Sequence, residues 1–322
     1  MEHNFVLDKE ARYTINQTSI TEVKLLGFQS CKEISFVLFA LLLTVYILTI
    51  FGNFLIITLV YHSKNLHTPM YFFLTQLSIS DIIITTDIAP NFLHILLHEG
   101  ATMSLTGCIV QQYIFDVMEC MECLLLTVMS YDRYLAICNP LHYMSIMNEL
   151  FCIKLIIIAW FLSFCSMLTA TVTVSFLDFC GPNIIDHFFC DFSPVLSLSC
   201  SETFWVQFEI IVNSVPFLFL PFFIIIISYG YIIFTILKIP SSTGKQKAFS
   251  TCSSHLTVVC IFYITLIVIY DLPTSGQSLT ISKLASLLYT MGTPLMNPII
   301  YSLRNRDIKI AFAELRNSFV RV

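Results

Sequence analysis

Charged residues are scarce in this chain of 322 residues, since Asp, Glu, Lys and Arg together make up only 11% of it. A soluble domain of ordinary composition carries about 25% charged residues. Hydrophobic residues account for 57% of the chain, and Phe alone occurs 29 times. This imbalance excludes an ordinary water-soluble domain and indicates that lipid is the main solvent.

The few charges are not gathered into a basic or acidic block, and the net charge is −5, so we do not expect nucleic acid as a partner. The chain has no internal repeat, which argues against a transporter or channel built from paired halves. It also lacks a nucleophile–base arrangement of the kind an enzyme needs. His187, Cys190 and Asp191 could be read as a metal site, but Cys190 is better used in a disulfide. We therefore expect neither an enzyme nor a metal site.

Seven segments are long and apolar enough to cross a bilayer as helices, which takes about 20 residues each. We predict an all-α membrane protein with a seven-transmembrane helix bundle at 34–303. An extracellular tail (1–33) precedes the bundle, and a cytoplasmic tail (304–322) with a short amphipathic helix follows it. The predicted spans are 34–60, 69–95, 105–137, 153–177, 205–237, 247–271 and 282–303.

The basic residues predict the orientation. An external N-terminus places eleven of the sixteen Lys and Arg residues on the cytoplasmic side and five outside, which favours a cytoplasmic C-terminus. The triplet Asn16-Gln17-Thr18 then lies outside, where Asn16 can be glycosylated. Residues 304–322 mix apolar and basic side chains, which suits a helix on the inner membrane surface, with a frayed tail as the alternative. We predict a multi-pass protein of the plasma membrane.

The twelve cysteines divide by their place relative to the predicted spans. Cys108, Cys180, Cys190 and Cys200 form an even set outside, where the environment is oxidising, and we expect two disulfides among them. Four cysteines allow three pairings, and the sequence alone does not choose between them. A bond from Cys108 would hold the long loop at about 178–204 over the top of the third span.

Asp132 and Arg133 lie at the end of the third apolar segment, within Met129-Ser130-Tyr131-Asp132-Arg133-Tyr134-Leu135-Ala136-Ile137-Cys138. A charge at bilayer depth costs several kcal/mol, so the pair belongs at the edge of the membrane or inside the bundle. On one of several spanning helices it indicates a switch at the inner face of a receptor. The alternative is a structural ion pair at a helix end.

Short motifs are spread along nearly the whole chain. Some are broad, namely Gly52-Asn53, Leu77, Ser78, Asp81, Cys108, Asp132-Arg133-Tyr134, Trp160 and Asn297-Pro298-Ile299-Ile300-Tyr301. Narrower ones are Leu66–Leu74, Met129–Cys138 with Pro140–Tyr143, Ser228-Tyr229, Lys247–Leu256 and Pro294–Pro298. In this order they resemble the olfactory receptors of vertebrates, a branch of the rhodopsin-like G-protein-coupled receptors. Phe262-Tyr263-Ile264 departs from the family's usual Phe-Tyr-Gly, which leaves the flexibility of the sixth helix in doubt.

The resemblance implies how the switch would work. Arg133 would pair at rest with Asp132 and with polar groups of the sixth helix, and would meet backbone carbonyls of a G protein on activation. Protonation of Asp132 would weaken the pair. Pro298 would kink the seventh helix and leave backbone groups for Asn297 and water to satisfy. The switch set is Asp132, Arg133, Tyr134, Tyr229, Asn297, Pro298 and Tyr301, with Tyr229 and Tyr301 meeting near Arg133 in the active state.

The resemblance also implies two disulfides, Cys108–Cys190 and Cys180–Cys200. It further implies an interior ion or proton site, formed by Asn53, Asp81, Glu122 and Asn297. Two carboxylates that lie together need a cation or a shared proton. This site would therefore hold a sodium ion or a proton, and no other cofactor is expected.

The ligand pocket should lie in the outer half of the bundle, between the third, fifth, sixth and seventh helices. Aromatic and aliphatic walls with a few polar anchors suit a small, volatile, mostly apolar ligand. Any one aromatic residue can equally serve ordinary helix packing. The candidates are Phe115, Asp116, Glu119, Cys120, Cys123, Asn213, Ser214, Phe217, Tyr263, Leu266, Ile267, Tyr270, Leu287 and Thr290.

Asp116 and Glu119 are not hallmarks of the family and are interpreted on their own. Two acids one turn apart in a span are unfavourable unless they face a cavity or a cation. They predict a preference for amine or other cationic odorants. The alternative is that one or both acids are protonated and merely hydrogen-bonded.

By resemblance, the chain would be an odorant receptor that binds a small volatile ligand from outside. It would activate a stimulatory olfactory-type heterotrimeric G protein and so raise cyclic AMP. The alternative is a rhodopsin-like receptor for a non-odorant amine or metabolite, expressed outside the olfactory epithelium. The sequence separates these poorly, because olfactory-type receptors can serve in other tissues. Retinal-type covalent binding is not expected, since the only lysine of the seventh span, Lys283, lies at its outer edge.

Overall fold

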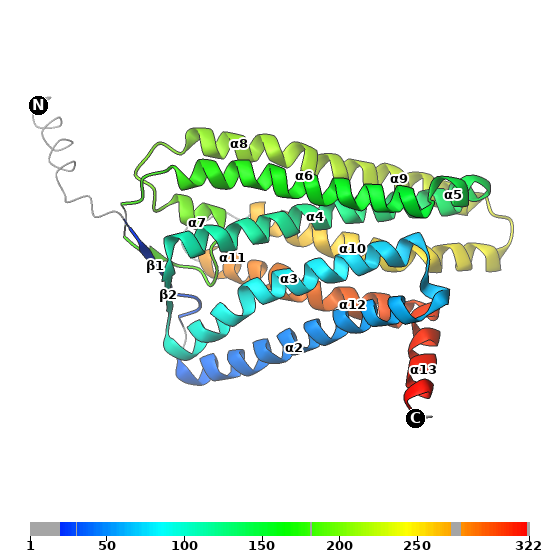
Figure 1. Ribbon diagram of the computed structural model, residues 1–322, viewed down its shortest axis with the longest axis horizontal. Helices are drawn as coiled ribbons and strands as arrows, with labels where there is room; N and C mark the ends of the chain where they lie inside the picture. Colours follow the sequence, from blue (N-terminus) through cyan, green and yellow to red (C-terminus); the bar gives the residue numbers. More distant parts are fainter. Residues whose placement is uncertain (1–19, 30, 181, 272–277, 321–322) are drawn as a thin grey trace, which may run out of the picture.

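Seven long helical runs lie side by side in the computed structural model, which describes residues 20–29, 31–180, 182–271 and 278–320 (Figure 1). Each run corresponds to one predicted span, which confirms the predicted bundle. The runs are α2 (Lys32–His62), α3 (Pro69–His98), α4 (Leu105–Cys138), α6 (Glu149–Ser175), α8–η3–α9 (Phe204–Ser214, Val215–Phe219 and Leu220–Lys238), α10 (Ser242–Asp271) and α11–η4–α12 (Ser278–Leu287, Leu288–Gly292 and Thr293–Arg304).

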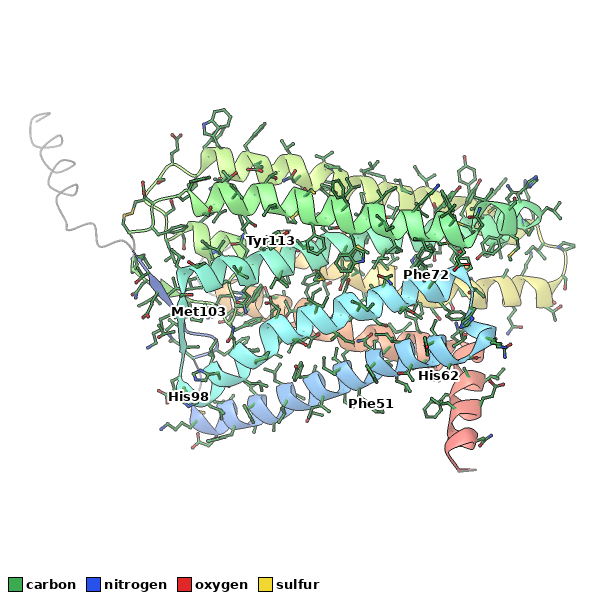
Figure 2. The ribbon with its side chains drawn as sticks, viewed as in Figure 1. Phe51, His62, Phe72, His98, Met103 and Tyr113 are labelled. Carbon is green, nitrogen blue, oxygen red and sulfur yellow. A yellow bond between two sulfur atoms is a disulfide. The ribbon has the colours of Figure 1, made fainter. Side chains whose placement is uncertain are left out.

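Helix α2 exposes apolar side chains to its surroundings and buries polar ones inside the bundle. Phe51 and Phe54 are 65% and 63% exposed, whereas Thr49 and Asn53 are fully buried. A surface helix of a water-soluble protein shows the opposite pattern, with its apolar stripe facing inward. Figure 2 shows Phe51 on the outer face of α2. Apolar side chains outside and polar ones inside are the arrangement that a hydrocarbon solvent favours.

Helix α4 is the polar centre of the bundle, packed against α3, α6, α9 and α10. Judged by length and composition alone, four of the described helical runs could cross a membrane, namely α2, α3, α6 and Phe204–Lys238. Helix α4 is not among them, and it carries Asp116, Glu119 and Glu122 within its predicted span. These acids are tolerable in a span because they meet protein rather than lipid.

A three-stranded sheet covers one end of the bundle, here called the sheet end (Figure 1). Its strand order is β2 (Ala101–Ser104), β1 (Glu22–Leu25) and β3 (Ile184–Ile185). Strand β1 pairs antiparallel with β2 and parallel with β3. The predicted tail 1–33 therefore contains structure that the sequence analysis missed. Val23 and Leu25 are fully buried and alternate with exposed neighbours, a period-two pattern typical of a strand.

The opposite end, here called the α13 end, carries the short elements η2 (Lys64–Leu66), α5 (Pro140–Ile146) and α13 (Arg306–Val320). Helix α13 turns across the end of the bundle, with Ile308 and Ala311 buried, so the predicted amphipathic helix is confirmed. Helix α5 was not predicted; Pro140 stands at its first position, where a missing N–H does no harm. Asn16 lies outside the described residues, and its glycosylation stays a prediction.

Candidate functional site

The Asp132–Arg133 pair lies near the α13 end of helix α4. Arg133 Nε donates a hydrogen bond to Asp132 Oδ2 at 2.9 Å, and Nη2 donates to the same oxygen. Tyr143 of α5 donates its hydroxyl to the other oxygen, Oδ1, at 2.7 Å. The Asp132 side chain is fully buried, and that of Arg133 is 12% exposed. Protein groups, rather than water, therefore balance this carboxylate.

The contact of Tyr143 with Asp132 was not predicted, since the sequence marked Tyr143 only as part of a motif. Burial raises the pKa of the Tyr143 phenol above its ordinary range, and the adjacent carboxylate adds to the effect. The phenol consequently stays protonated and remains a donor. Pro140 starts the short helix that brings Tyr143 back to α4, which is the one signal that pointed to this contact.

Tyr229 links α9 to α10. Its hydroxyl lies 2.6 Å from His255 Nδ1, and the two rings stack at 5.8 Å between centroids. The hydrogen bonds of Arg133 among the described residues all go to Asp132, so the expected contacts with polar groups of α10 are not among them. At this end, α9 and α10 are thus held together by a bond separate from the ion pair.

Tyr134 and Tyr301 make no hydrogen bond to the ion pair among the described residues. Tyr134 packs edge-on against Tyr231 with ring centroids 6.0 Å apart, and so faces α9. Tyr301 is 1% exposed, and its hydroxyl has no hydrogen-bond partner in the described part of the chain. The approach of Tyr229 and Tyr301 to Arg133 concerns the active state and stays a prediction.

Asn53 of α2 supports helix α12 at Pro298. Because Pro298 has no backbone N–H, the carbonyl of Pro294, one turn earlier, loses its helical donor. Asn53 Nδ2 donates to this carbonyl at 3.1 Å. We expected Asn297 and water to satisfy the freed groups, but Asn297 donates to Asp81 instead. The first span, not the seventh itself, compensates for the proline.

We expect Asn53→Leu to lower the free energy of unfolding by about 1–3 kcal/mol, because the buried Pro294 carbonyl would lose its donor. Thermal unfolding of the purified protein in detergent measures this change. Thr44→Val is the matched control, since the exposed Thr44 hydroxyl donates to Ala40 O in its own helix. Equal melting temperatures for the two variants would contradict the role given to Asn53.

Asp81 and Glu122 form a buried acidic pair inside the bundle. They are 0% and 2% exposed, and their carboxyls are in hydrogen-bonding contact. Asn297 Nδ2 donates to both oxygens of Asp81, at 3.0 and 3.1 Å. Asn53 was also predicted at this site, but Nδ2 is directed to Pro294, and none of its hydrogen bonds among the described residues reaches Asp81. The structure thus brings three of the four predicted residues together.

Two disulfides fasten the loop between α6 and α8. Cys108 in the first turn of α4 bonds to Cys190, and Cys180 bonds to Cys200, which is the pairing that the resemblance implied. Gln111 Oε1 accepts the backbone N–H of Cys190 at 3.0 Å. The loop is therefore held against the end of α4 by a covalent bond and a hydrogen bond one turn apart.

Lys283 of α11 also ties the loop between α6 and α8 to the bundle. Its Nζ donates to Asp186 Oδ1 at 2.5 Å and to Gly27 O at 2.9 Å, so α11 is tied both to the loop and to the segment after β1. The Lys283 side chain is 7% exposed. These contacts were not predicted, because the partners lie 97 and 256 positions away along the chain.

His187, in the same loop, makes the stability of the folded state depend on pH. Burial and the neighbouring Lys283 lower the pKa of its imidazole from 6.5 to about 4. The unfolded chain therefore binds more protons than the folded one between pH 6.5 and pH 4, and the folded state loses stability as the pH falls through this window. We expect a loss of about 2 kcal/mol between pH 7 and pH 5.

Thermal unfolding at pH 7 and pH 5 tests this expectation, with His187→Gln as the reference that does not titrate. Burial raises the pKa of Asp191, which favours the folded state at low pH and so opposes the effect of His187. The difference between wild type and variant isolates the histidine. If His187→Gln were as sensitive to acid as the wild type, the histidine would not be responsible.

Aromatic side chains fill the region where the ligand pocket was predicted. Phe115 of α4 packs against Phe189 of the loop, with ring centroids 5.1 Å apart, and against Tyr289 of η4 at 5.9 Å. Tyr263 of α10 packs against Phe222 of α9 at 4.8 Å. This aromatic cluster joins four helical runs of the bundle to the loop between α6 and α8.

The other candidates divide by exposure. Cys123, Leu266 and Thr290 are buried, while Asn213, Phe217 and Leu287 are half-buried.

Some candidates are directed elsewhere. Ser163 of α6 donates to Cys120 Sγ at 3.3 Å, so Cys120 faces α6. Ser214 donates to Ile211 O of its own helix at 2.7 Å. Ile267 is 51% exposed and faces the outside of the bundle, so its prediction as a ligand contact is wrong. One step along a helix turns a side chain by about 100°, which takes Ile267 off the inner face. The side chain of Tyr270 lies outside the described residues.

Asp116 and Glu119 are half-buried and form an acidic group with Asp191 of the loop. The three carboxyls are close enough to repel one another electrostatically. Gln112 Nε2 donates to Asp116 Oδ2 at 3.5 Å, and Asp191 Oδ1 accepts the N–H of Phe192 at the start of α7 (Phe192–Leu196). From the sequence, Asp191 was a candidate only for a metal site. Its place over α4 follows from the adjacent disulfide.

Comparison with known proteins places this sequence in a family. Residues 42–316 match the family model described as olfactory receptor. Human olfactory receptor 13A1 is 46% identical over 94% of this chain and 93% of that protein. Human olfactory receptor 10A7 is 45% identical over 91% of this chain and 93% of its own length, and rat olfactory receptor 1468 is 43% identical over 92% and 94%.

The fold agrees with this relationship. Squid rhodopsin superposes with a TM-score of 0.72 over 91% of this chain and 88% of its own, at 16% sequence identity. Identity at that level shows the fold alone, whereas identity above 40% over most of the chain shows the family. The chain therefore belongs to the olfactory receptor family and is a multi-pass membrane receptor with the rhodopsin fold, not an enzyme.

Proposed function

We propose that this receptor binds a small volatile odorant near the sheet end of the bundle and activates a heterotrimeric G protein at the α13 end. The sheet end would face outside, because disulfides form in an oxidising environment, and the basic residues favour the cytoplasm for the other end. Epitope tags at the two termini, read on intact and permeabilised cells, test this orientation. Both termini on one side of the membrane would contradict it.

The observation that carries the proposal is the buried Asp132–Arg133 pair on α4. The same helix bears Phe115, Asp116 and Glu119 toward its other end, so one rigid element connects the two regions. A ligand that favours one arrangement of α4 and its neighbours shifts the equilibrium at both ends.

Activation would release Arg133 from Asp132. The guanidinium offers five N–H donors, and the structure uses those on Nε and Nη2. Once released, it can donate to backbone carbonyls of the G protein. Coupling to the stimulatory olfactory type would raise cyclic AMP, and a reporter of cyclic AMP in cells that express this G protein is the direct test.

The ligand site that we propose has aromatic walls and one acidic side. Phe115 and Tyr263 supply apolar surface, while Asp116, Glu119 and Asp191 repel one another until a cation or a proton offsets their charge. We therefore expect amines to activate the receptor at lower concentration than acids, aldehydes or esters of the same size. A non-odorant amine or metabolite would be recognised by the same groups, and expression outside the olfactory epithelium would favour that alternative.

Glu119→Gln tests the acidic side. We expect amines to lose roughly 10- to 100-fold in potency, because a hydrogen bond to a charged group contributes about 1.5–3 kcal/mol. Glu209→Gln is the matched control, since Glu209 is an acid of another helix, α8, and accepts the Thr173 hydroxyl of α6 at 2.9 Å. Unchanged amine potency in Glu119→Gln would contradict the proposed preference for cations. It would not contradict the proposal that the receptor binds an odorant.

We also propose that Asp81 and Glu122 share a sodium ion or a proton. Two carboxyls in contact cannot both stay charged without a cation. Glu122 Oε1, which has no hydrogen-bond partner among the described residues, supplies a further ligand atom. Replacing sodium by choline in the assay buffer distinguishes the two. A sodium site predicts a change in basal signalling in choline, whereas a shared proton predicts none.

A further inference from the structure

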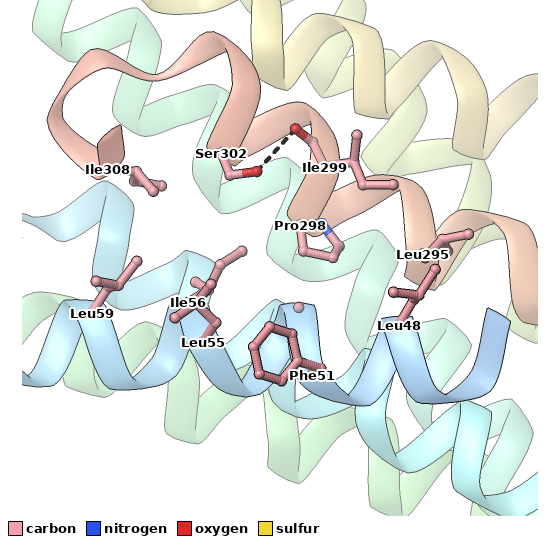
Figure 3. A pocket seen from close by; sticks show the side chains of 11 residues that line it. Leu48, Phe51, Leu55, Ile56, Leu59, Leu295, Pro298, Ile299, Ser302 and Ile308 are labelled. Carbon is pink, nitrogen blue, oxygen red and sulfur yellow. Dashed lines mark hydrogen bonds between the residues drawn. The ribbon is translucent and has the colours of Figure 1, made fainter. Parts of the chain in front are cut away.

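An apolar groove runs along the outside of the bundle between α2 and α12, and Ile308 of α13 closes one end of it (Figure 3). Its volume is about 210 Å³. Phe51 and Leu48 stand at its open side and are 65% and 51% exposed, whereas Ile56 and Ile308 are buried at 2% each. The groove therefore opens to the surroundings of the bundle, which for this receptor is the hydrocarbon of the membrane.

Gly52 and Pro298 create the groove. A Cβ on Gly52 would lie 3.1 Å from Pro298 Cγ, so α2 and the proline ring are in tight contact there. The larger side chains Leu55 and Leu295 stand to either side of this contact and form the walls. A close contact between a glycine and a proline ring, next to bulky side chains, leaves a channel that neither helix fills.

The lining of the groove is almost wholly apolar. Ser302 is the one polar side chain there, and its hydroxyl donates to Ile299 O at 3.2 Å (Figure 3). Pockets that enclose drug-sized ligands have volumes of about 300–1,000 Å³, so this groove is too small for one. Its size and its almost wholly apolar walls fit a single hydrocarbon chain.

Cationic side chains gather where the groove meets η2 and α13. Lys64 of η2 and Lys309, next to the lining residue Ile308, are exposed, and η2 packs against α13. Asp307 is the acid at this place, and it accepts a hydrogen bond from the Tyr71 hydroxyl at 3.2 Å. With the orientation proposed above, this end lies in the cytoplasmic leaflet, where anionic lipids attract lysines near the surface.

We propose that the groove binds one acyl chain of an anionic phospholipid, with the headgroup at Lys64 and Lys309. The walls of the groove include Pro298 and Ile299, so the bound chain packs directly on α12 at the proline that Asn53 supports. A sterol, or a second copy of the receptor, is the competing occupant that the experiment must separate.

Photolabelling of the full-length receptor in phosphatidylcholine nanodiscs tests the proposal. The probe is phosphatidylserine that carries a diazirine in its acyl chain, and mass spectrometry maps the labelled peptides. We expect label on the segments around Leu55 and Leu295. Leu55→Trp should reduce it at least fivefold by filling the groove, whereas Phe54→Trp, on the lipid-facing neighbour outside the lining, should leave it unchanged.

The headgroup contact is tested separately with exposed residues, whose substitution leaves the fold intact. The double variant Lys64→Gln, Lys309→Gln should lower labelling roughly tenfold, to the level of a phosphatidylcholine probe. Lys238→Gln is the control, because Lys238 lies over the Phe234 ring at the end of α9. Equal labelling of Leu55→Trp and wild type, displacement by cholesterol but not by phosphatidylserine, or crosslinks between two receptors at this groove would each overturn the proposal. The readout is independent of odorant response and of G-protein coupling.

Discussion

Replacing Asp132 by Ala is expected to lower the free energy of unfolding by about 3–5 kcal/mol, since it leaves a buried cation without its partner. Both described hydrogen bonds of Arg133 end on this carboxylate, and so does that of Tyr143. With 12% of its side chain exposed, Arg133 has little water to replace the lost charge. Thermal unfolding in detergent, compared with wild type, measures the loss.

Two further variants separate charge from packing. Asp132→Ala combined with Arg133→Leu should recover much of the lost stability, because no uncompensated charge remains. Asp132→Asn keeps an acceptor for Tyr143 but weakens the hold on Arg133, so basal cyclic AMP should rise several-fold if release of Arg133 is the activating step. If Asp132→Ala were as stable as the wild type, the ion pair would not be buried as described.

Replacing Cys108 and Cys190 together by Ser is expected to cost about 2–5 kcal/mol of stability and to abolish odorant response. The bond closes a loop with a sequence separation of 82, and a crosslink over a long stretch removes much chain entropy from the unfolded state. It also holds Phe189 against Phe115 and Asp191 near Glu119, so the ligand region would lose its cover.

The second disulfide supplies the comparison. Cys180 and Cys200 are separated by only 20 positions, so their replacement should cost roughly 1 kcal/mol less by the same entropic reasoning. Cys260→Ser controls for the loss of a thiol, because Cys260 is exposed and unbonded. Surface expression and thermal unfolding of the three variants give the ranking. A larger effect from Cys180 and Cys200 than from Cys108 and Cys190 would contradict it.

The helices predicted from the sequence were confirmed where a whole segment lies in one solvent, the hydrocarbon of the membrane. Each of the seven apolar runs became one helical run, because a backbone in hydrocarbon must satisfy its own hydrogen bonds. The short strand β1 was missed, since four residues with Val23 and Leu25 inward carry too weak a pattern to stand out from a polar tail. Ile267 was misplaced for a related reason: apolar residues face lipid as readily as they face the core.

What the sequence determined by itself was the set of spanning segments, the amphipathic segment after them and the motifs that carry the family. These depend on local composition and on spacing along the chain. What only the tertiary structure decided were the partners of buried polar groups: Asn53 with Pro294, Tyr143 with Asp132, and Lys283 with Asp186. In a medium without water each such group must bond to whatever helix or loop packs beside it, and that neighbour lies far away in the sequence.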